Sequence, residues 1–335
     1  MNDLNTWHGK RHLADDPLRG QSYRNGLVSI QAEEGLEYKW MLHESKEWFE
    51  KAKVIQGSDW EWSKEDAPKV SYKFDYLGFR NDKSIKEISK DPNWWLFESA
   101  CFGLGPGLDV QRTAPRMLEE YTEIPVYNMS LFGDRPELIT NNILELSKRW
   151  INPPKKIILH ISEHPTGSYR FENSNKVTNI DYPGLLLSEL ITGSTPDQFS
   201  WFENFEEQKM GEGHHRLAYN TIIKLCDVLK INLSWLYTGE VGDYSPVNYL
   251  KEHQDIIFCQ PVPGSGCGSY NKETPFNERK RIVSNAVIDP ITTYQPARGA
   301  EAFDVSRDLF HPGPESHKVM AQTICQHFLE SKRNF

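Results

Sequence analysis

Two segments far apart in the chain carry residue types suited to nucleophilic catalysis. Ser99 follows an apolar run and precedes a glycine-rich stretch, and a serine at the end of a buried strand can project its hydroxyl beside oxyanion-binding N–H groups. Asp308 and His311 stand three residues apart, so the carboxylate can orient the imidazole as a general base. The competing interpretations are structural: a glycine-rich turn in the first segment and a helix cap in the second.

Alternating elements are expected to position these residues. Short apolar runs predict strands at 93–97, 125–129, 156–161, 232–237 and 255–259, and helical spacing predicts helices over 113–121, 135–150, 214–230 and 315–332. This alternation predicts a three-layer α/β/α sandwich with a mostly parallel, flavodoxin-like five-stranded sheet. Ligands of such sheets bind beyond the carboxyl ends of the strands, where Ser99 falls.

The chain divides into an extension and a main domain. Residues 1–90 are polar and aromatic, and we expect them to pack on the main domain, with a helix within 33–53 and a strand at 69–74. Residues 91–335 form the main domain, interrupted by insertions at about 163–212 and 260–300. Loops of this length are usually functional or disordered, and both insertions follow predicted strands.

Composition excludes several classes of function. The chain has 335 residues with 38 Lys and Arg against 47 Asp and Glu, and the resulting net charge of −9 argues against a general nucleic-acid binder. A run of about 18 apolar residues is absent from the sequence, as is a secretory signal, so we expect no membrane association and a cytoplasmic location. The five widely spaced cysteines suggest reduced thiols.

Four short blocks resemble those of the SGNH/GDSL hydrolases. The blocks are Ser99 with Gly103, similar to G-D-S-x-x-x-G; Asn128-x-Ser130-x-x-Gly133; Asp308-x-x-His311-Pro312-Gly313 with His317 beyond it; and Asp75–Arg80, similar to N-x-x-G-(F/Y)-R. The resemblance covers residues 70–335 or so, and the ordered combination is more specific than any single block.

The resemblance implies a serine hydrolase that cleaves an ester, such as an O-acetyl or other short acyl group on a carbohydrate or small molecule. Ser99 would be the nucleophile, His311 the base and Asp308 its orienting carboxylate. The N–H groups of Ser99 and Gly133 would bind the oxyanion. The resemblance implies no metal or organic cofactor, and His160 and His164 lack the helical spacing of a metal pair.

The sequence departs from the family pattern at two places. Phe97-Glu98 replaces the Gly-Asp before the nucleophile, and the third strand lacks the Asn that donates to the oxyanion. Candidate substitutes or substrate-binding residues are Ser162, His164, Arg170 and, in the aromatic insertion, Trp201. The alternative is therefore a catalytically impaired scaffold, for example a virion-associated structural protein that binds a protein partner through its extension. An acyltransferase would use the same residues.

Overall fold

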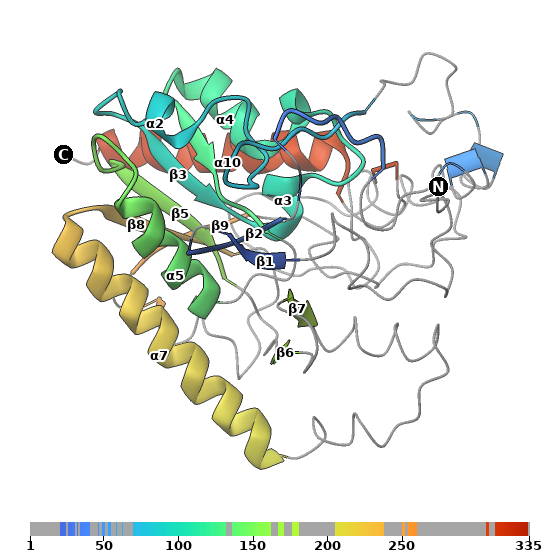
Figure 1. Cartoon of the computed structure of the whole chain (residues 1–335). Coiled ribbons are helices and arrows are strands. Elements are labelled where there is room, and N and C mark those ends of the chain that lie inside the picture. Colours follow the sequence, from blue (N-terminus) through green and yellow to red (C-terminus); the bar gives the residue numbers. More distant parts are fainter. Residues whose placement is uncertain are drawn as a thin grey trace, which may run out of the picture.

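The computed structural model describes most of the predicted main domain and parts of the segments around it (Figure 1). The described residues are 21–24, 26–30, 32, 34–40, 46, 49–50, 53–54, 58, 62, 70–131, 136–161, 167–170, 176–180, 205–237, 250–251, 254–259, 306–307 and 312–333.

The centre of the molecule is a five-stranded parallel sheet. Its strands, in spatial order, are β4 (Val126–Asn128), β3 (Trp95–Glu98), β5 (Lys156–His160), β8 (Asn232–Tyr237) and β9 (Asp255–Phe258). All four neighbouring pairs are parallel, and the strand order reverses direction between β3 and β5. The predicted doubly wound α/β sandwich is confirmed.

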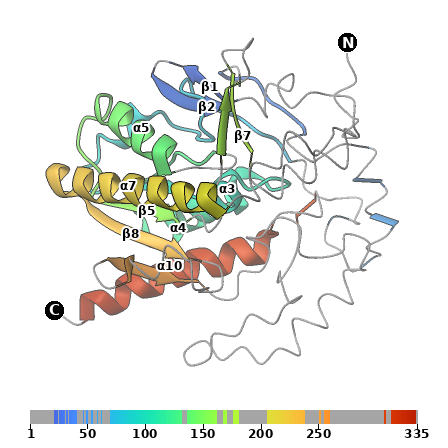
Figure 2. The same cartoon turned by 90° about the horizontal axis from the view of Figure 1, so that it is seen from below.

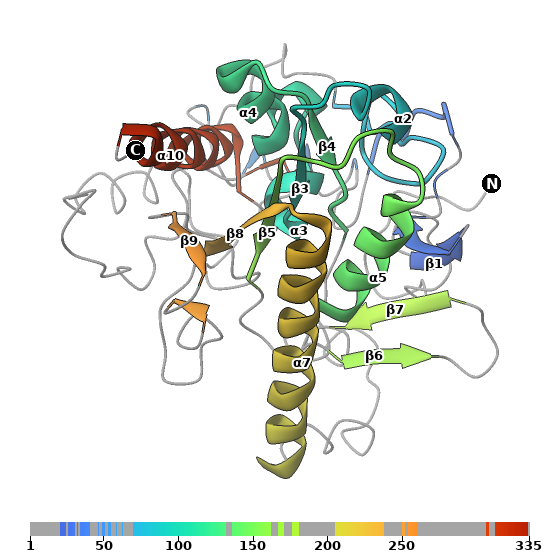
Figure 3. The same ribbon diagram turned by 90° about the vertical axis from the view of Figure 1, so that its left-hand side faces the viewer.

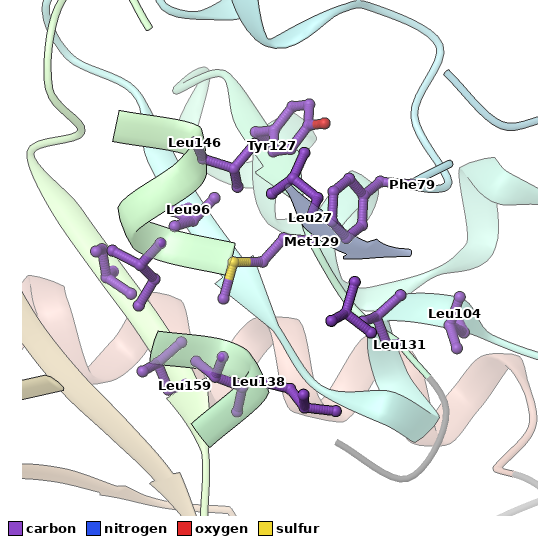
Figure 4. Close-up of a cluster of buried hydrophobic side chains, with 14 of the residues drawn as sticks. Leu27, Phe79, Leu96, Leu104, Tyr127, Met129, Leu131, Leu138, Leu146 and Leu159 are labelled. Atoms are coloured by element: carbon purple, nitrogen blue, oxygen red, sulfur yellow. The ribbon is translucent and has the colours of Figure 1, made fainter. Parts of the chain in front are cut away.

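Helices cover both faces of this sheet, as Figures 2 and 3 show from two directions. One layer holds α5 (Pro136–Ser147) and α7 (Phe205–Leu229), and the other holds α4 (Ala114–Thr122) and α10 (Pro314–Arg333). Because side chains alternate along a strand, Leu96 of β3 joins the core under α5, whereas Phe97 joins the core under α10. Figure 4 shows the first of these cores, in which Leu96 lies near Leu146, and Leu138 lies near Leu159.

A second, antiparallel sheet was not predicted. Its spatial order is β2 (Leu27–Ile30), β1 (Gln21–Arg24), β7 (Lys176–Ile180) and β6 (Gly167–Arg170). It therefore joins the extension to the first insertion, and it lies on the α5 side of the molecule (Figure 3). Asn142 of α5 fixes it there, because the amide exchanges hydrogen bonds of 2.9 and 2.8 Å with the backbone of Val28.

The extension differs from the predicted elements at two places. The predicted strand at 69–74 is wrong: its described residues make one isolated bridge, Tyr72 to Tyr38, before the chain turns at Asp75. The predicted helix within 33–53 does not include its first described residues. Gly35 has a φ of +77° and Tyr38 is extended in the bridge, and both conformations are incompatible with a helix there.

Two short helices stand beside the first strands of the large sheet. Helix α2 (Ile85–Ile88) begins with a capping box, in which Ser84 and Glu87 satisfy each other's backbone N–H groups. Helix α3 (Ala100–Leu104) follows β3 directly, and a 3-10 turn, η3 (Val110–Arg112), leads into α4. In the part of the chain that the structure describes, every helix is too short or too polar to traverse a bilayer.

Candidate active site

Ser99 lies at the junction between the inner strand β3 and helix α3. β3 pairs with β4 on one side and β5 on the other and ends at Glu98. The carbonyl of Ser99 then accepts the N–H of Gly103 at 2.7 Å, which closes the first turn of α3. The Ser99 side chain is fully buried, and its Oγ has no hydrogen-bond partner among the described residues. The structure thus places Ser99 at the carboxyl end of a strand, as the sequence predicts.

The backbone N–H of Ser99, which the sequence assigns to the oxyanion hole, is engaged. It donates to Oγ of Ser130, at the end of the neighbouring strand β4, over 2.8 Å. Gly103 makes this approach possible, because a Cβ at Gly103 would lie 1.8 Å from Ser130 Oγ. The first two sequence blocks therefore meet side by side at one edge of the sheet.

Asn128 connects the ends of β3 and β4 through both atoms of its amide. Its Nδ2 donates to the carbonyl of Gly103 at 2.8 Å, and its Oδ1 accepts the N–H of Ser130 at 3.1 Å. The backbone of Asn128 is itself held by the side chain of Asn81, which donates at 2.8 Å and accepts at 2.9 Å. The Asn-x-Ser pattern therefore fixes the geometry around Ser99, and Asn81 is a supporting residue that the sequence analysis missed.

Arg80 holds the loop that follows α3. Its buried guanidinium donates to the carbonyls of Leu104, Gly105 (3.0 Å) and Leu108, and stacks on the ring of Tyr72 at 4.5 Å. A buried cation is stable only when its N–H groups find such acceptors. The sequence offered the Asp75–Arg80 block only as a resemblance, and the structure gives it a function in supporting the glycine-rich loop.

Asp75 organises the turn that delivers Arg80. One carboxylate oxygen accepts the N–H groups of Leu77 (2.9 Å) and Phe79 (3.1 Å), and the other accepts the Tyr127 hydroxyl at 2.6 Å. Burial raises the pKa of Asp75 to about 6, although these hydrogen bonds act in the opposite direction. Burial, together with the nearby Asp75 charge, also raises the pKa of Tyr127, which keeps the phenol a donor. The turn is therefore a buried polar unit behind β4.

The predicted base and its partner, His311 and Asp308, lie outside the described residues. The residues on either side are described and buried: Ser306 and Arg307 before them, and Pro312 after them. A Cβ at Gly107 would lie 2.7 Å from Ser306 Oγ, so the loop after α3 packs closely on that flank.

His317, which the sequence analysis mentioned only beside the last block, connects α10 to the same region. Its Nδ1 accepts the N–H of Ala114 at 3.0 Å, so Nδ1 carries no proton in this arrangement. Its ring centroid lies 5.0 Å from that of Phe102 in α3. The start of α10 is therefore packed against the helix that follows Ser99.

Several candidate residues are not placed by the structure. Gly133, Ser162, His164 and Trp201 lie outside the described residues, and for Arg170 only the backbone, in β6, is described. His160 ends β5, and burial lowers its pKa to about 4, which keeps the imidazole neutral near pH 7. Within the described ranges, His, Cys, Asp and Glu form no group of three or more that could hold a metal ion.

Comparison with known proteins gives one structural likeness to report. No family model matches the sequence, and a search of curated proteins finds no match. Among solved structures, the chain is similar to a protein from Desulfitobacterium hafniense DCB-2 that is described as a lipolytic protein of the G-D-S-L family. Identity is 11%, the match covers 70% of this chain and 99% of that one, and the TM-score is 0.37. A likeness this distant says nothing about activity.

Proposed function

We propose that the protein is a serine hydrolase that cleaves an ester carrying an O-acetyl or other short acyl group on a carbohydrate or small alcohol. The observation that carries this proposal is the state of Ser99. Its hydroxyl is buried at the carboxyl end of β3 without a hydrogen-bond partner among the described residues, while Asn128 and Ser130 around it are paired. An unpaired buried hydroxyl costs free energy, and at active sites such a cost is a feature of function.

In the proposed reaction, Ser99 Oγ attacks the acyl carbonyl while His311 takes its proton. The tetrahedral intermediate collapses, and the leaving alkoxide takes that proton from His311. Water then attacks the acyl-enzyme with the same base, which releases the acid and restores Ser99. Asp308 orients the imidazole and stabilises its charged form. The residues on both sides of Asp308 and His311 support this proposal. Before them, Ser306 packs against Gly107 in the loop after α3. After them, His317 packs against Phe102 of α3, and only four residues, 308–311, lie between the described Arg307 and Pro312.

The oxyanion is proposed to bind the N–H groups of Ser99 and Gly133. Because the Ser99 N–H donates to Ser130 Oγ, it must exchange that partner for the oxyanion as the intermediate forms. Ser162, His164, Arg170 and Trp201 remain proposed substrate-binding residues. Loss of one oxyanion donor costs about 10²–10³ in turnover, so the missing Asn after the third strand predicts a slow enzyme.

Hydrolysis of p-nitrophenyl acetate tests this proposal. We expect Ser99→Ala to lower turnover by at least about 10³-fold, since removal of the nucleophile leaves only the other contributions. Ser29→Ala is the matched control: Ser29 is equally buried, and its Oγ also lacks a partner among the described residues, but it lies in β2 of the other sheet. Equal rates for wild type and Ser99→Ala would overturn the proposal and favour a binding or structural protein.

A further inference from the structure

We propose that Arg307 is a positioning residue through which the N-terminal extension fixes the segment that carries the base of the active site. This inference rests on the proposed function, because Arg307 directly precedes Asp308 in the sequence. It assigns the extension a part in catalysis instead of a separate docking role.

The contact between Arg307 and the extension is specific. The Arg307 guanidinium is buried, donates from Nη2 to the carbonyl of Lys39 at 2.6 Å, and lies 4.3 Å from the centroid of the Trp40 ring. A planar guanidinium can stack on an aromatic face and donate in its own plane at the same time, whereas an ammonium lacks this geometry. Two consecutive residues of the extension therefore fix both the position and the plane of Arg307.

Gly107 connects this contact to the loop that follows Ser99. Its φ is +80°, and a Cβ there would lie 2.8 Å from the backbone nitrogen of Arg307, so the two backbones touch. The N–H of Gly107 donates to the Tyr72 hydroxyl at 2.6 Å, and Tyr72 pairs through its backbone with Tyr38. The extension thus contacts Gly107 through Tyr72 and Arg307 through Lys39 and Trp40.

This junction of the extension, the loop and Arg307 can affect catalysis because Arg307 is joined directly to Asp308 in the chain. A residue whose side chain and backbone are both held restricts the direction in which the chain leaves it, here toward Asp308. A displacement of about 1 Å in a catalytic group can cost about 10²-fold in rate. Loss of the Arg307 contacts should therefore impair the base more than it impairs folding.

The rate at which a fluorophosphonate probe labels Ser99 tests this, because labelling requires an activated hydroxyl. In the full-length chain, we expect Arg307→Ala and Trp40→Leu to slow labelling of the folded protein about tenfold or more. Arg307→Lys should be impaired as well, and Trp40→Phe should be close to wild type because it keeps an aromatic face. Lys53→Ala is the control, since it removes a cation–aromatic contact of the same extension, with Phe49, at 5.3 Å.

The pH profile separates positioning from a merely structural contribution. If Asp308 is displaced, the imidazole loses its carboxylate partner and its pKa falls, so the acid limb of the labelling rate moves to lower pH in the impaired variants. Wild-type labelling rates and an unchanged acid limb in Arg307→Ala and Trp40→Leu would overturn the inference and leave the proposed function intact. If wild-type Ser99 itself is not labelled, the proposed function fails, and the inference fails with it.

Discussion

Two regions of the parallel sheet each contain a buried serine among polar residues, and the two serines differ in their hydrogen bonding. In one cluster, named the amino-end cluster because Lys156 and Asp255 begin β5 and β9, Ser234 Oγ accepts from Lys156 Nζ at 3.3 Å and donates to Asp255. His327 of α10 contacts the other oxygen of Asp255 at 2.7 Å. At the carboxyl ends, by contrast, Ser99 Oγ has no partner among the described residues.

The comparison teaches that residue types alone do not define a catalytic site. The amino-end cluster contains Ser, Asp and His, but there the carboxylate stands between the serine and the imidazole. In a nucleophilic triad the imidazole must stand in the middle, because it takes the proton from the hydroxyl. The Ser234 hydroxyl is therefore committed to structural hydrogen bonds, whereas the Ser99 hydroxyl makes none among the described residues.

The largest effect is expected from Gly103→Ala, which tests the close packing around Ser99. The added Cβ would lie 1.8 Å from Ser130 Oγ and 2.7 Å from Asn128 Oδ1, so the hydrogen bonds that these two side chains make beside Ser99 must be distorted or lost. We expect a loss of about 3 kcal/mol in the free energy of unfolding and loss of esterase activity. Denaturant titration and p-nitrophenyl acetate turnover measure the two effects.

Gly35→Ala is the control for this glycine. Gly35 has a φ of +77°, but a Cβ there would meet no atom within 4 Å. Substitution of Gly35 by Ala should lower the free energy of unfolding only by the backbone strain, about 1 kcal/mol. Equal losses at both glycines would contradict the close approach of Ser130 to Gly103.

The pKa values of two carboxyl groups, Asp75 behind β4 and Asp255 at the start of β9, are shifted in opposite directions. Asp75 has a folded-state pKa of about 6, above its ordinary 3.8, so its contribution to stability is full below about pH 4 and is lost as the pH rises to about 6. For Asp255, burial raises the pKa, but hydrogen bonds from His327 and Ser234 outweigh it and leave the pKa lowered. Its contribution is present above about pH 4 and is lost as the pH falls further.

Urea unfolding between pH 3 and pH 7 measures both slopes. Relative to Asp75→Asn, wild type should lose about 1–3 kcal/mol of stability as the pH rises through the Asp75 window. Relative to Asp255→Asn, the dependence should have the opposite sign and be smaller, because that carboxyl is partly exposed. The same sign at both positions would contradict the account of the two environments.

The smallest effect on catalysis is expected from a substitution of Ser234 in the amino-end cluster. Ser234→Ala removes the hydroxyl between Lys156 and Asp255 and should cost about 1 kcal/mol of stability. Turnover of p-nitrophenyl acetate should stay within about twofold of wild type, because Ser234 lies within β8, level with Phe97 and not with Ser99, and its hydroxyl is already paired with Lys156 and Asp255. A loss of turnover comparable to that of Ser99→Ala would show that Ser234, and not Ser99 alone, takes part in catalysis.

The sequence predicts the large sheet well because its signal is local. Each strand is a short apolar run, and each covering helix has its own periodicity, so alternation alone gives the layers. The small sheet pairs residues 21–30 with 167–180, and its strands of four or five residues carry little pattern of their own. Such pairing depends on tertiary contacts, which the sequence does not display locally.

The residues of the candidate site also fall into those that the sequence predicts and those that it does not. Ser99, Asn128 and Ser130 are recognisable from spacing because each lies within two residues of the end of a predicted strand. The support from Arg80 and Asn81 was not predicted as such, because their partners are backbone carbonyls and amides that any residue type could provide. Likewise, the Arg307–Trp40 contact joins residues 267 positions apart, and neither one has a spacing that indicates the other.

The most direct test of the central claim is to map the adduct of a fluorophosphonate probe by peptide mass spectrometry of the wild-type chain. The account predicts a single modified serine, Ser99, with labelling lost in Ser99→Ala and retained in Ser234→Ala. An adduct on Ser234 or another serine, or no adduct on a folded chain that hydrolyses p-nitrophenyl acetate, would contradict it.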